Sequence, residues 1–225
     1  MLLIKIWGSL IAPKDKIWLD DTYLKQISAF LGQFNNIFLA HWTWNIGHWR
    51  VRELIKKNPW KDLNALLIGD FENWKKVLLD YFKNVDKYFS WFKRLSIEYF
   101  LDNDKNLFSE GRFIVWWDVI KTWNIISSDD IISDMMNYNF IEFVLILTDV
   151  NGVYDEKWNV IKKITKDNLA NIKFWKKEND VTWWMKQKVL KILSSWKKAV
   201  ICDWKNLENI NNRIKYGHWE GTVIN

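Results

Sequence analysis

The sequence predicts an α/β fold with a mainly parallel central sheet, and three observations support this class. Short apolar runs of strand length recur, segments with the apolar spacing of helices alternate with them, and no linker, low-complexity tract or repeat divides the chain. Strands that are apolar throughout are typical of parallel sheets, in which helices cover both faces. Regular alternation of strands and helices favours the same arrangement. We therefore expect a single domain over residues 1–225.

The predicted strands are apolar runs that end at turn or polar residues. The run Ile141–Leu147 gives the strongest signal of a buried strand. The segment Val153–Ile164 is expected to form a hairpin that turns around Lys157–Asn159. The six strands are expected at Leu2–Ile6, Asn36–Ala40, Phe113–Val115, Ile141–Leu147, Ala199–Cys202 and Thr222–Ile224.

Helical spacing of apolar residues places helices between these strands. In Asp20–Leu31, for example, Leu24, Ile27 and Leu31 share one face. The long region Lys61–Phe100 is expected to hold two helices. Its many aromatic residues are expected to lie in the core, and the alternative is that some line an apolar substrate pocket. The other helices are expected at Trp49–Lys57, Asp129–Met136 and Trp184–Ser195.

Composition excludes several classes of protein. At 49% hydrophobic and 27% charged residues, the chain can bury a core, so disorder is excluded. The single Cys202 excludes an intramolecular disulfide and a cysteine-rich zinc site, and three histidines disfavour a histidine metal site. No transmembrane run and no signal-peptide pattern are found, so we expect a cytoplasmic protein without a membrane partner. The net charge of +6 favours an anionic partner, such as nucleic acid, a nucleotide or a phosphorylated metabolite.

Tryptophan and glycine occur in an inverted ratio. The chain has 18 Trp and only 8 Gly, whereas average usage predicts about 16 Gly in this length. Turns need glycine and few positions need tryptophan, so selection for packing does not produce this ratio. The ratio therefore needs another explanation, and the positions of the Trp residues in the sequence can supply one.

Five segments and a short tail carry the motifs that point to chemistry. They are Lys5-Ile6-Trp7-Gly8-Ser9-Leu10, His41-Trp42-Thr43-Trp44-Asn45-Ile46-Gly47-His48, Trp116-Trp117-Asp118-Val119-Ile120 with Ser127-Ser128-Asp129-Asp130, Thr148-Asp149-Val150-Asn151-Gly152-Val153-Tyr154-Asp155, Asp180-Val181-Thr182-Trp183-Trp184-Met185-Lys186-Gln187-Lys188, and Gly221-Thr222-Val223-Ile224.

Together these segments resemble the amino-acid kinase family, whose members use ATP to phosphorylate carboxylates, carbamate, UMP or isopentenyl phosphate. In that family the first strand ends in K-x-G-G-S and the second in an H-G-G-G-like loop. The nucleotide strand reads T-D-V-D-G-V-Y, and the lysine segment reads D-V-T-G-G-M-x-x-K. The resemblance covers nearly the whole chain in the same order. It implies a three-layer αβα sandwich, with an acceptor part at about 1–140 and a nucleotide part at about 141–225.

A second histidine indicates the subfamily. His41 is followed seven residues later by His48, which resembles the H-G-G-G-S-F-G-H loop of isopentenyl phosphate kinases, and fosfomycin kinase-like members have related loops. Thr43 and the pair Asn45-Ile46 depart from that loop. The resemblance implies transfer of phosphate from ATP to isopentenyl phosphate, giving isopentenyl diphosphate. The alternative is another small-molecule kinase with a fosfomycin-, uridylate- or glutamate-type acceptor.

The resemblance also assigns roles to residues. Lys5 would contact the transferring phosphoryl group, Lys188 the ATP phosphates and His48 the acceptor phosphate, while Lys14 would add a third charge. Asp129 or Asp130 would orient the lysines. The acceptor phosphate would be bound by Gly8, Ser9, Trp42, Thr43, Trp44, Gly47, His48, Trp117 and Asp118. ATP would be bound by Lys5, Trp7, Gly8, Thr148, Asp149, Gly152, Val153, Tyr154, Trp183, Trp184 and Lys188.

The cofactors and partners follow from the same resemblance. Mg²⁺ is expected to arrive with ATP and to be held mainly by phosphates and water, with no metal site built from the protein. A homodimer is expected, without a nucleic-acid partner. A remote alternative is a binder of single-stranded nucleic acid that stacks bases on its many Trp, which would require exposed Trp along one groove. Arg94 is the cation that could argue for a carboxylate or nucleotide acceptor.

Many of the Trp residues stand where glycine belongs. Phosphate loops need glycine because backbone N–H groups must approach phosphate oxygens closely, often at positive φ. In the motifs, the positions where the family has glycine are Trp7, Trp42, Trp44, Trp117, Trp183 and Trp184. Others lie in turn contexts, as in Pro59-Trp60, Asn73-Trp74, Lys157-Trp158-Asn159, Ser195-Trp196 and Asp203-Trp204.

These positions suggest that each Trp is a UGA codon that the source organism reads as glycine, as some bacterial lineages do. The corrected chain would have 8 + 18 = 26 Gly and no Trp. UGG codons at positions 7, 42 and 44 would contradict this hypothesis. The polypeptide made literally as written is expected to be inactive as a kinase, because several indoles would fill the phosphate site.

Overall fold

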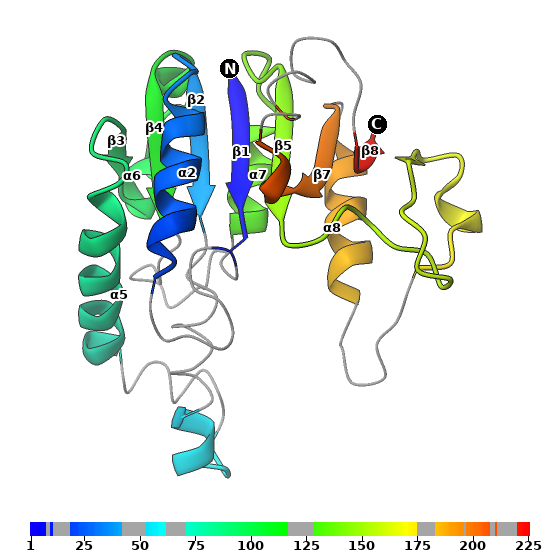
Figure 1. Ribbon diagram of the computed structural model, residues 1–225. Helices are drawn as coiled ribbons and strands as arrows, with labels where there is room; N and C mark the ends of the chain where they lie inside the picture. Colours follow the sequence, from blue (N-terminus) through cyan, green and yellow to red (C-terminus); the bar gives the residue numbers. More distant parts are fainter. Residues whose placement is uncertain are drawn as a thin grey trace.

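The chain folds around one eight-stranded sheet (Figure 1). The computed structural model describes residues 1–7, 10, 19–41, 53–61, 71–116, 128–174, 183–195, 197–207, 210 and 220–225. The strand order is β3-β4-β2-β1-β5-β7-β8-β6, and each strand pair is parallel except β7 with β8. The strands are β1 Leu2–Ile6, β2 Ile37–His41, β3 Lys93–Leu95, β4 Arg112–Trp116, β5 Phe143–Thr148, β6 Lys163–Ile164, β7 Ala199–Asp203 and β8 Thr222–Ile224.

Helices cover both faces of the sheet, as the order of strands and helices along the chain predicts. One face packs against α2 and α5, and the other packs against α6, α7 and α8. Figure 1 shows α2 in front of the sheet and α6 and α7 behind it. The helices are α2 Asp21–Leu31, α5 Phe71–Asp86, α6 Ile97–Asp102, α7 Ser128–Met135 and α8 Trp183–Ser194, with short 3₁₀ helices η1 Lys105–Phe108, η2 Leu169–Asn171 and η3 Trp204–Asn206.

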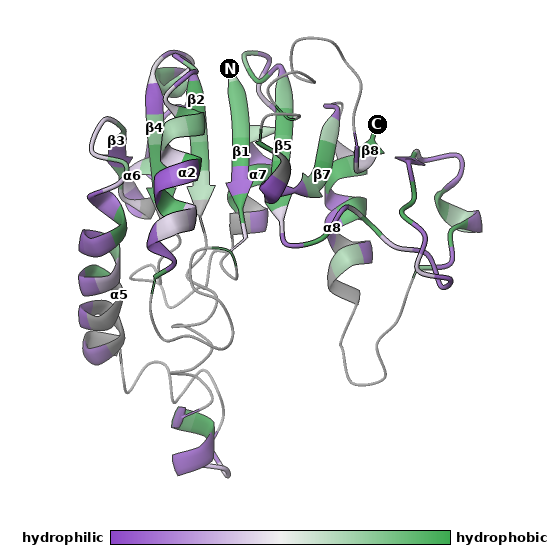
Figure 2. Cartoon of the chain, in the orientation of Figure 1, coloured by the Kyte–Doolittle hydropathy of each residue, from purple (hydrophilic) through white to green (hydrophobic). Residues whose placement is uncertain are grey.

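Strand β1 lies at the centre of the sheet, between β2 and β5. Its residues alternate between the faces: Leu2, Ile4 and Ile6 join the core under α2 and α5, while Leu3 joins the core under α6, α7 and α8. Figure 2 shows the hydrophobic colouring of β1, β2, β5 and β7. The same alternation directs Lys5 toward the face that α7 and α8 cover, which places a charge inside an apolar strand.

The strands predicted from apolar runs are confirmed within a residue or two, and Asp20 is the N-cap of α2 rather than its first residue. The hairpin is also confirmed, since Tyr154 and Val160 form an antiparallel bridge. The prediction of two helices across Lys61–Phe100 was wrong in part, because β3 lies between α5 and α6. This three-residue edge strand carries two exposed basic residues, so it has no apolar run to reveal it.

The aromatic residues of that region serve the core. Tyr81, Phe82, Phe89 and Phe92 are buried with α2 against one face of the sheet. Phe100 is buried on the other face against Phe38, Phe108 and Phe113. The predicted core role is confirmed for these five, whereas Tyr99 is exposed. None of the described helices combines the length and apolar character needed to cross a membrane.

Gly152, in the turn after β5, is predicted to tolerate no side chain. Its φ is +147°, and a Cβ there would lie 2.6 Å from Thr222 Oγ1 and 3.0 Å from Val160 Cγ1. Gly152→Ala is expected to lower the free energy of unfolding by about 1–3 kcal/mol, the usual cost of such backbone strain. Urea denaturation measures the loss. The control is Gly32→Ala, because a Cβ at Gly32 comes no closer than 3.4 Å to any atom. An equal loss in both variants would contradict this account.

Candidate active site

The candidate site lies at the carboxyl end of β1. The chain places β2 on one side of β1 and β5 on the other, so the strand order reverses there. In open α/β sheets, ligands bind beyond the carboxyl ends of the strands at such a switch point. Lys5 is the next-to-last residue of β1, and Thr148 is the last residue of β5. The predicted phosphate residues on these two strands therefore lie at the same edge of the sheet.

Lys5 is a buried cation. Only 3% of its side chain is exposed, and it sits between Ile4 and Ile6, which are buried. Its Nζ donates a hydrogen bond to Asp129 Oδ1 and forms an ion pair with that carboxylate. Asp129 lies in the first turn of α7, which packs across β1 and β2. A charge at this depth needs such a partner, because isolated buried ions are very costly.

Asp129 also contacts the second predicted lysine. Lys188 Nζ lies 3.6 Å from Asp129 Oδ2, and the Lys188 side chain is only 13% exposed. Lys188 comes from α8, which lies beside α7 on the same face of the sheet. One carboxylate thus joins two ammonium groups from segments far apart in the sequence. This is the arrangement that the orienting role of Asp129 requires.

The charges of the three groups are strongly coupled. Burial alone would raise the pKa of Asp129, but the ammonium groups of Lys5 and Lys188 offset it and hold that pKa below its ordinary value. Burial and the positive charge of Lys5 lower the pKa of Lys188 to about 7, although Asp129 opposes the shift. The site is therefore rich in positive charge and short of negative charge, so an added anion is favoured there.

Lys191 is an exposed cation near this site that the sequence analysis did not name. Its charge acts on both Asp129 and Lys188. It follows Lys188 by three residues on α8, so the two share a helix face. That spacing was the signal that could have found it, whereas the predicted third cation, Lys14, lies outside the described residues.

Trp7 occupies the space in front of Lys188. The Lys188 Nζ lies 4.2 Å from the centroid of the indole ring. The ring packs against core residues on both sides of the sheet. The indole Nε1 is buried, and among the described residues it has no hydrogen-bond partner. A large apolar ring thus lies where the resemblance places an ATP phosphate.

Residues that were predicted to bind ATP stabilise the turn after β5 through hydrogen bonds within the protein. The Thr148 hydroxyl donates to the Val150 carbonyl at 2.8 Å and accepts from the Val150 N–H at 3.1 Å. The Val153 N–H donates to Thr222 Oγ1 at 2.7 Å. Thr148, Gly152 and Val153 are buried and shape the turn, while Asp149 is exposed and Tyr154 is half-buried. Of these, Asp149 is the one whose side chain is open to a ligand.

Several predicted site residues lie outside the described residues, and their roles stay predictions. They are Gly8, Ser9, Lys14, Trp42, Thr43, Trp44, Gly47, His48, Trp117 and Asp118. Asp130, Trp183 and Trp184 belong to α7 and α8 by their backbone. The structure therefore brings together Lys5, Trp7, Asp129 and Lys188, with Thr148 at the end of the neighbouring strand and Asp149 directly after it.

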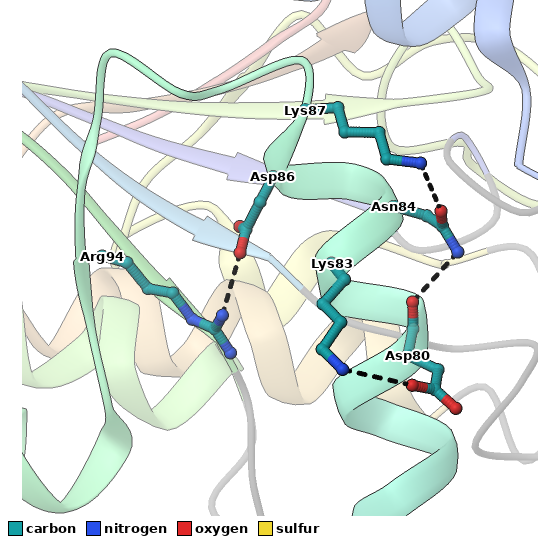
Figure 3. A network of polar contacts seen from close by, with 6 residues as sticks. All are labelled: Asp80, Lys83, Asn84, Asp86, Lys87 and Arg94. Carbon is teal, nitrogen blue, oxygen red and sulfur yellow. Dashed lines mark hydrogen bonds and ion pairs between the residues drawn. The ribbon is translucent and has the colours of Figure 1, made fainter.

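Arg94 is engaged with its own chain. Its guanidinium pairs with Asp86 at 2.9 Å and lies 5.6 Å from the centroid of the Phe82 ring. Figure 3 shows this pair beside the polar contacts of Asp80, Lys83 and Asn84 on α5 and of Lys87, which directly follows that helix. The two contacts of Arg94 fasten β3 to α5. They give no support to Arg94 as the cation of a carboxylate or nucleotide acceptor site.

Comparisons with known proteins match this chain by structure rather than by sequence. No family model matches it, and no curated protein matches it significantly in sequence. Solved structures match over the full chain. The isopentenyl phosphate kinase of T. acidophilum, in a product complex, superposes with a TM-score of 0.62 at 20% identity, with all of both chains covered.

Uridylate kinases also have this architecture. The enzyme from Archaeoglobus fulgidus matches with a TM-score of 0.69 at 14% identity, and the match covers 100% of this chain and 99% of that one. The UMP kinase from Bacillus anthracis matches with a TM-score of 0.61 at 15% identity, covering 100% and 95%. The chain therefore has the three-layer α/β fold of these kinases. The architecture implied by the resemblance to the amino-acid kinase family is confirmed.

The low pKa of Lys188 predicts a pH-dependent stability. In the unfolded chain the lysine keeps its ordinary pKa of 10.5, whereas in the folded chain it is about 7. Between these values the unfolded state binds more protons, so Lys188 makes the free energy of unfolding rise with pH. Urea denaturation across that window should show the stability of the unchanged chain increasing relative to Lys188→Met. Lys186→Met, which removes an exposed lysine of the same helix, is the control. A difference that does not change with pH would contradict the assignment.

Removing the shared carboxylate should destabilise the folded protein. Asp129→Asn leaves Lys5 buried without the charge it now pairs with, and breaking such a pair costs about 3 kcal/mol. The control is Asp134→Asn on the same helix, where burial raises the pKa of the carboxyl and the charge is less favoured. Thermal or urea unfolding should show a large loss for the first variant and little for the second. Equal effects would mean that Asp129 has no special role.

Proposed function

We propose that this protein is an ATP-dependent kinase that transfers the γ-phosphoryl group to a small phosphorylated acceptor. The observation that carries the proposal is the group formed by Lys5, Asp129 and Lys188 at the switch point of the sheet. One carboxylate that contacts Lys5 and Lys188 forms a positively charged site at that point. Phosphoryl transfer depends mainly on positioning and on neutralising negative charge, and such a site supplies both.

The acceptor that we propose is isopentenyl phosphate. Two things support it: the His41 and His48 spacing of the second loop, and the presence of isopentenyl phosphate kinases among the structures that share the fold. Uridylate is the second candidate, because uridylate kinases share the fold as well. The pairing of Arg94 with Asp86 gives no support to a nucleotide acceptor at that position.

The proposed reaction is an in-line displacement. An oxygen of the acceptor phosphate forms a bond to the γ-phosphorus of ATP, and the bond from that phosphorus to the β,γ-bridging oxygen breaks, so that ADP leaves. The acceptor is already an anion, so no proton has to be removed. Lys5 would neutralise the transferring group and Lys188 the β- and γ-phosphates, while His48 would hold the acceptor phosphate.

Mg²⁺ would arrive with ATP and neutralise part of the phosphate charge. Asp129 is a poor candidate for a metal ligand, since Lys5 engages one carboxylate oxygen and Lys188 lies near the other. We therefore assign Asp129 to orienting the two lysines. In this proposal the protein neutralises phosphate charge with its lysines, and Asp129 only orients them.

An acceptor panel tests the proposal. ADP formation is measured with isopentenyl phosphate, dimethylallyl phosphate, fosfomycin, UMP and glutamate, for the chain as printed and for a chain with all 18 Trp replaced by Gly. Isopentenyl phosphate is expected to give the highest kcat/KM. A preference for UMP would support the second candidate. If neither chain phosphorylates any acceptor, the proposal is wrong.

His48→Ala tests the acceptor site within the same assay. Loss of one positioned donor is expected to lower kcat by about 10²–10³-fold. The matched control is His218→Ala, which removes a histidine without an assigned role in the reaction. Full activity in the His48 variant would reject the proposed role of that residue, while phosphorus NMR of the product would still establish the reaction.

A further inference from the structure

The backbone at Trp158 has a conformation that glycine favours. Its φ is +64°, and among the described residues it is the only residue other than glycine with a positive φ. Left-handed backbone is rare for bulky side chains, because their Cβ crowds the neighbouring carbonyl. The other three described residues with a positive φ are all glycines: Gly111, Gly152 and Gly221. Trp158 is therefore the exception in a class that otherwise contains only glycine.

The turn around Trp158 explains this geometry. The Trp158 N–H donates to the Asp155 carbonyl at 3.1 Å, and the Asp155 N–H donates to the Asn159 carbonyl at 2.9 Å. Asp155 Oδ1 also accepts hydrogen bonds from the N–H groups of Lys157 and Asn159. This is a three-residue hairpin loop whose last residue must be left-handed, and glycine is the usual residue there. The indole itself is 60% exposed and contacts the ring of Tyr154.

Trp7 is a second position with an independent reason for glycine. Its indole lies 4.2 Å in front of Lys188 and leaves Nε1 buried, with no partner among the described residues. A buried unsatisfied N–H is unfavourable, and native proteins contain few of them. Glycine would remove this group and would open the space between Lys188 and the backbone at the end of β1. Anion sites of this kind need a close approach to backbone N–H groups.

We infer that the functional form of this protein carries glycine at positions 7 and 158, and that one reassigned codon places glycine at all 18 Trp positions. Trp91 and Trp204 pack against core residues, and nothing in their backbone requires glycine. They are included because a single reading of UGA accounts for every Trp at once. The Trp7 argument rests on the proposed function, whereas the Trp158 argument does not.

Peptide masses of the protein made by its own organism give the direct test. Trypsin cleaves after lysine, so the peptides 6–14 and 158–162 each contain one of the two positions and no other Trp. Each peptide is expected to have the mass of its glycine form, and the intact protein is expected to lack indole fluorescence. Tryptophan at either position would overturn the inference. No step of this test involves ATP, so its outcome is independent of the proposed function.

Chains that each retain a single tryptophan test the effects of positions 7 and 158 separately. The reference is a chain with all 18 Trp changed to Gly, and three further chains each retain one Trp, at position 7, 158 or 60. With Trp7 retained, the Kd for ATP is expected to rise at least tenfold. With Trp158 retained, ATP binding should be unchanged and the urea midpoint should fall. Trp60, which is 96% exposed and lacks a positive φ, is the control and should change neither.

The outcomes of these chains are distinct. If Trp7 leaves ATP binding unchanged, the indole does not block the site and that part of the inference is wrong. If Trp158 leaves the urea midpoint unchanged, the turn does not need glycine. If the reference chain binds no ATP, the proposed function fails, while the peptide masses and the effect of Trp158 on unfolding still decide the identity of the residues.

Discussion

A buried positive charge in the central strand is the constraint on which the rest of this structure depends. Lys5 lies in a strand whose other residues are apolar, and its ammonium group pairs there with Asp129 from α7. That contact requires α7 to pack across β1 and β2 with its first turn at the carboxyl end of the sheet. The same carboxylate attracts Lys188 from α8. One carboxylate therefore connects α7 and α8 to the central strand, and it gathers the cations of the candidate site at one point.

Much of this architecture could be predicted from the sequence, because the apolar runs are strong. Strands β1, β5 and β7 are apolar along most of their length, so periodicity alone finds them. Strand β3 could not be found in this way, since Lys93 and Arg94 face solvent and the strand has only three residues. The meeting of Lys5, Asp129 and Lys188 could be anticipated only from the motif resemblance, because no spacing along the chain places them together. Lys191 was missed although its helical spacing from Lys188 was available.

The inferred replacement of glycine by tryptophan would affect sequence and structural comparisons differently. Apolar strand patterns survive when glycine is written as tryptophan, because both faces of the sheet are built from Ile, Leu, Val and Phe. The phosphate-loop motifs are changed, because they are recognised by their glycines, which have no side chain. A chain in which Trp stands for Gly would keep this fold, while its phosphate-loop motifs would depart from the family pattern at each glycine position. The full-length structural matches at 14–20% identity agree with that description.

The strand order also determines how the molecule can be assembled as it is synthesised. Of the eight strands, β1 comes first along the chain, yet it pairs with β2 on one edge and with β5 on the other, and β5 begins only at Phe143. The far half of the sheet needs β8, which lies between β7 and β6. On the ribosome, β1 to β4 can pair early while one edge of β1 remains open, and open apolar edges favour wrong association. The central position of β1 thus leaves its second edge unpaired until β5 has been made.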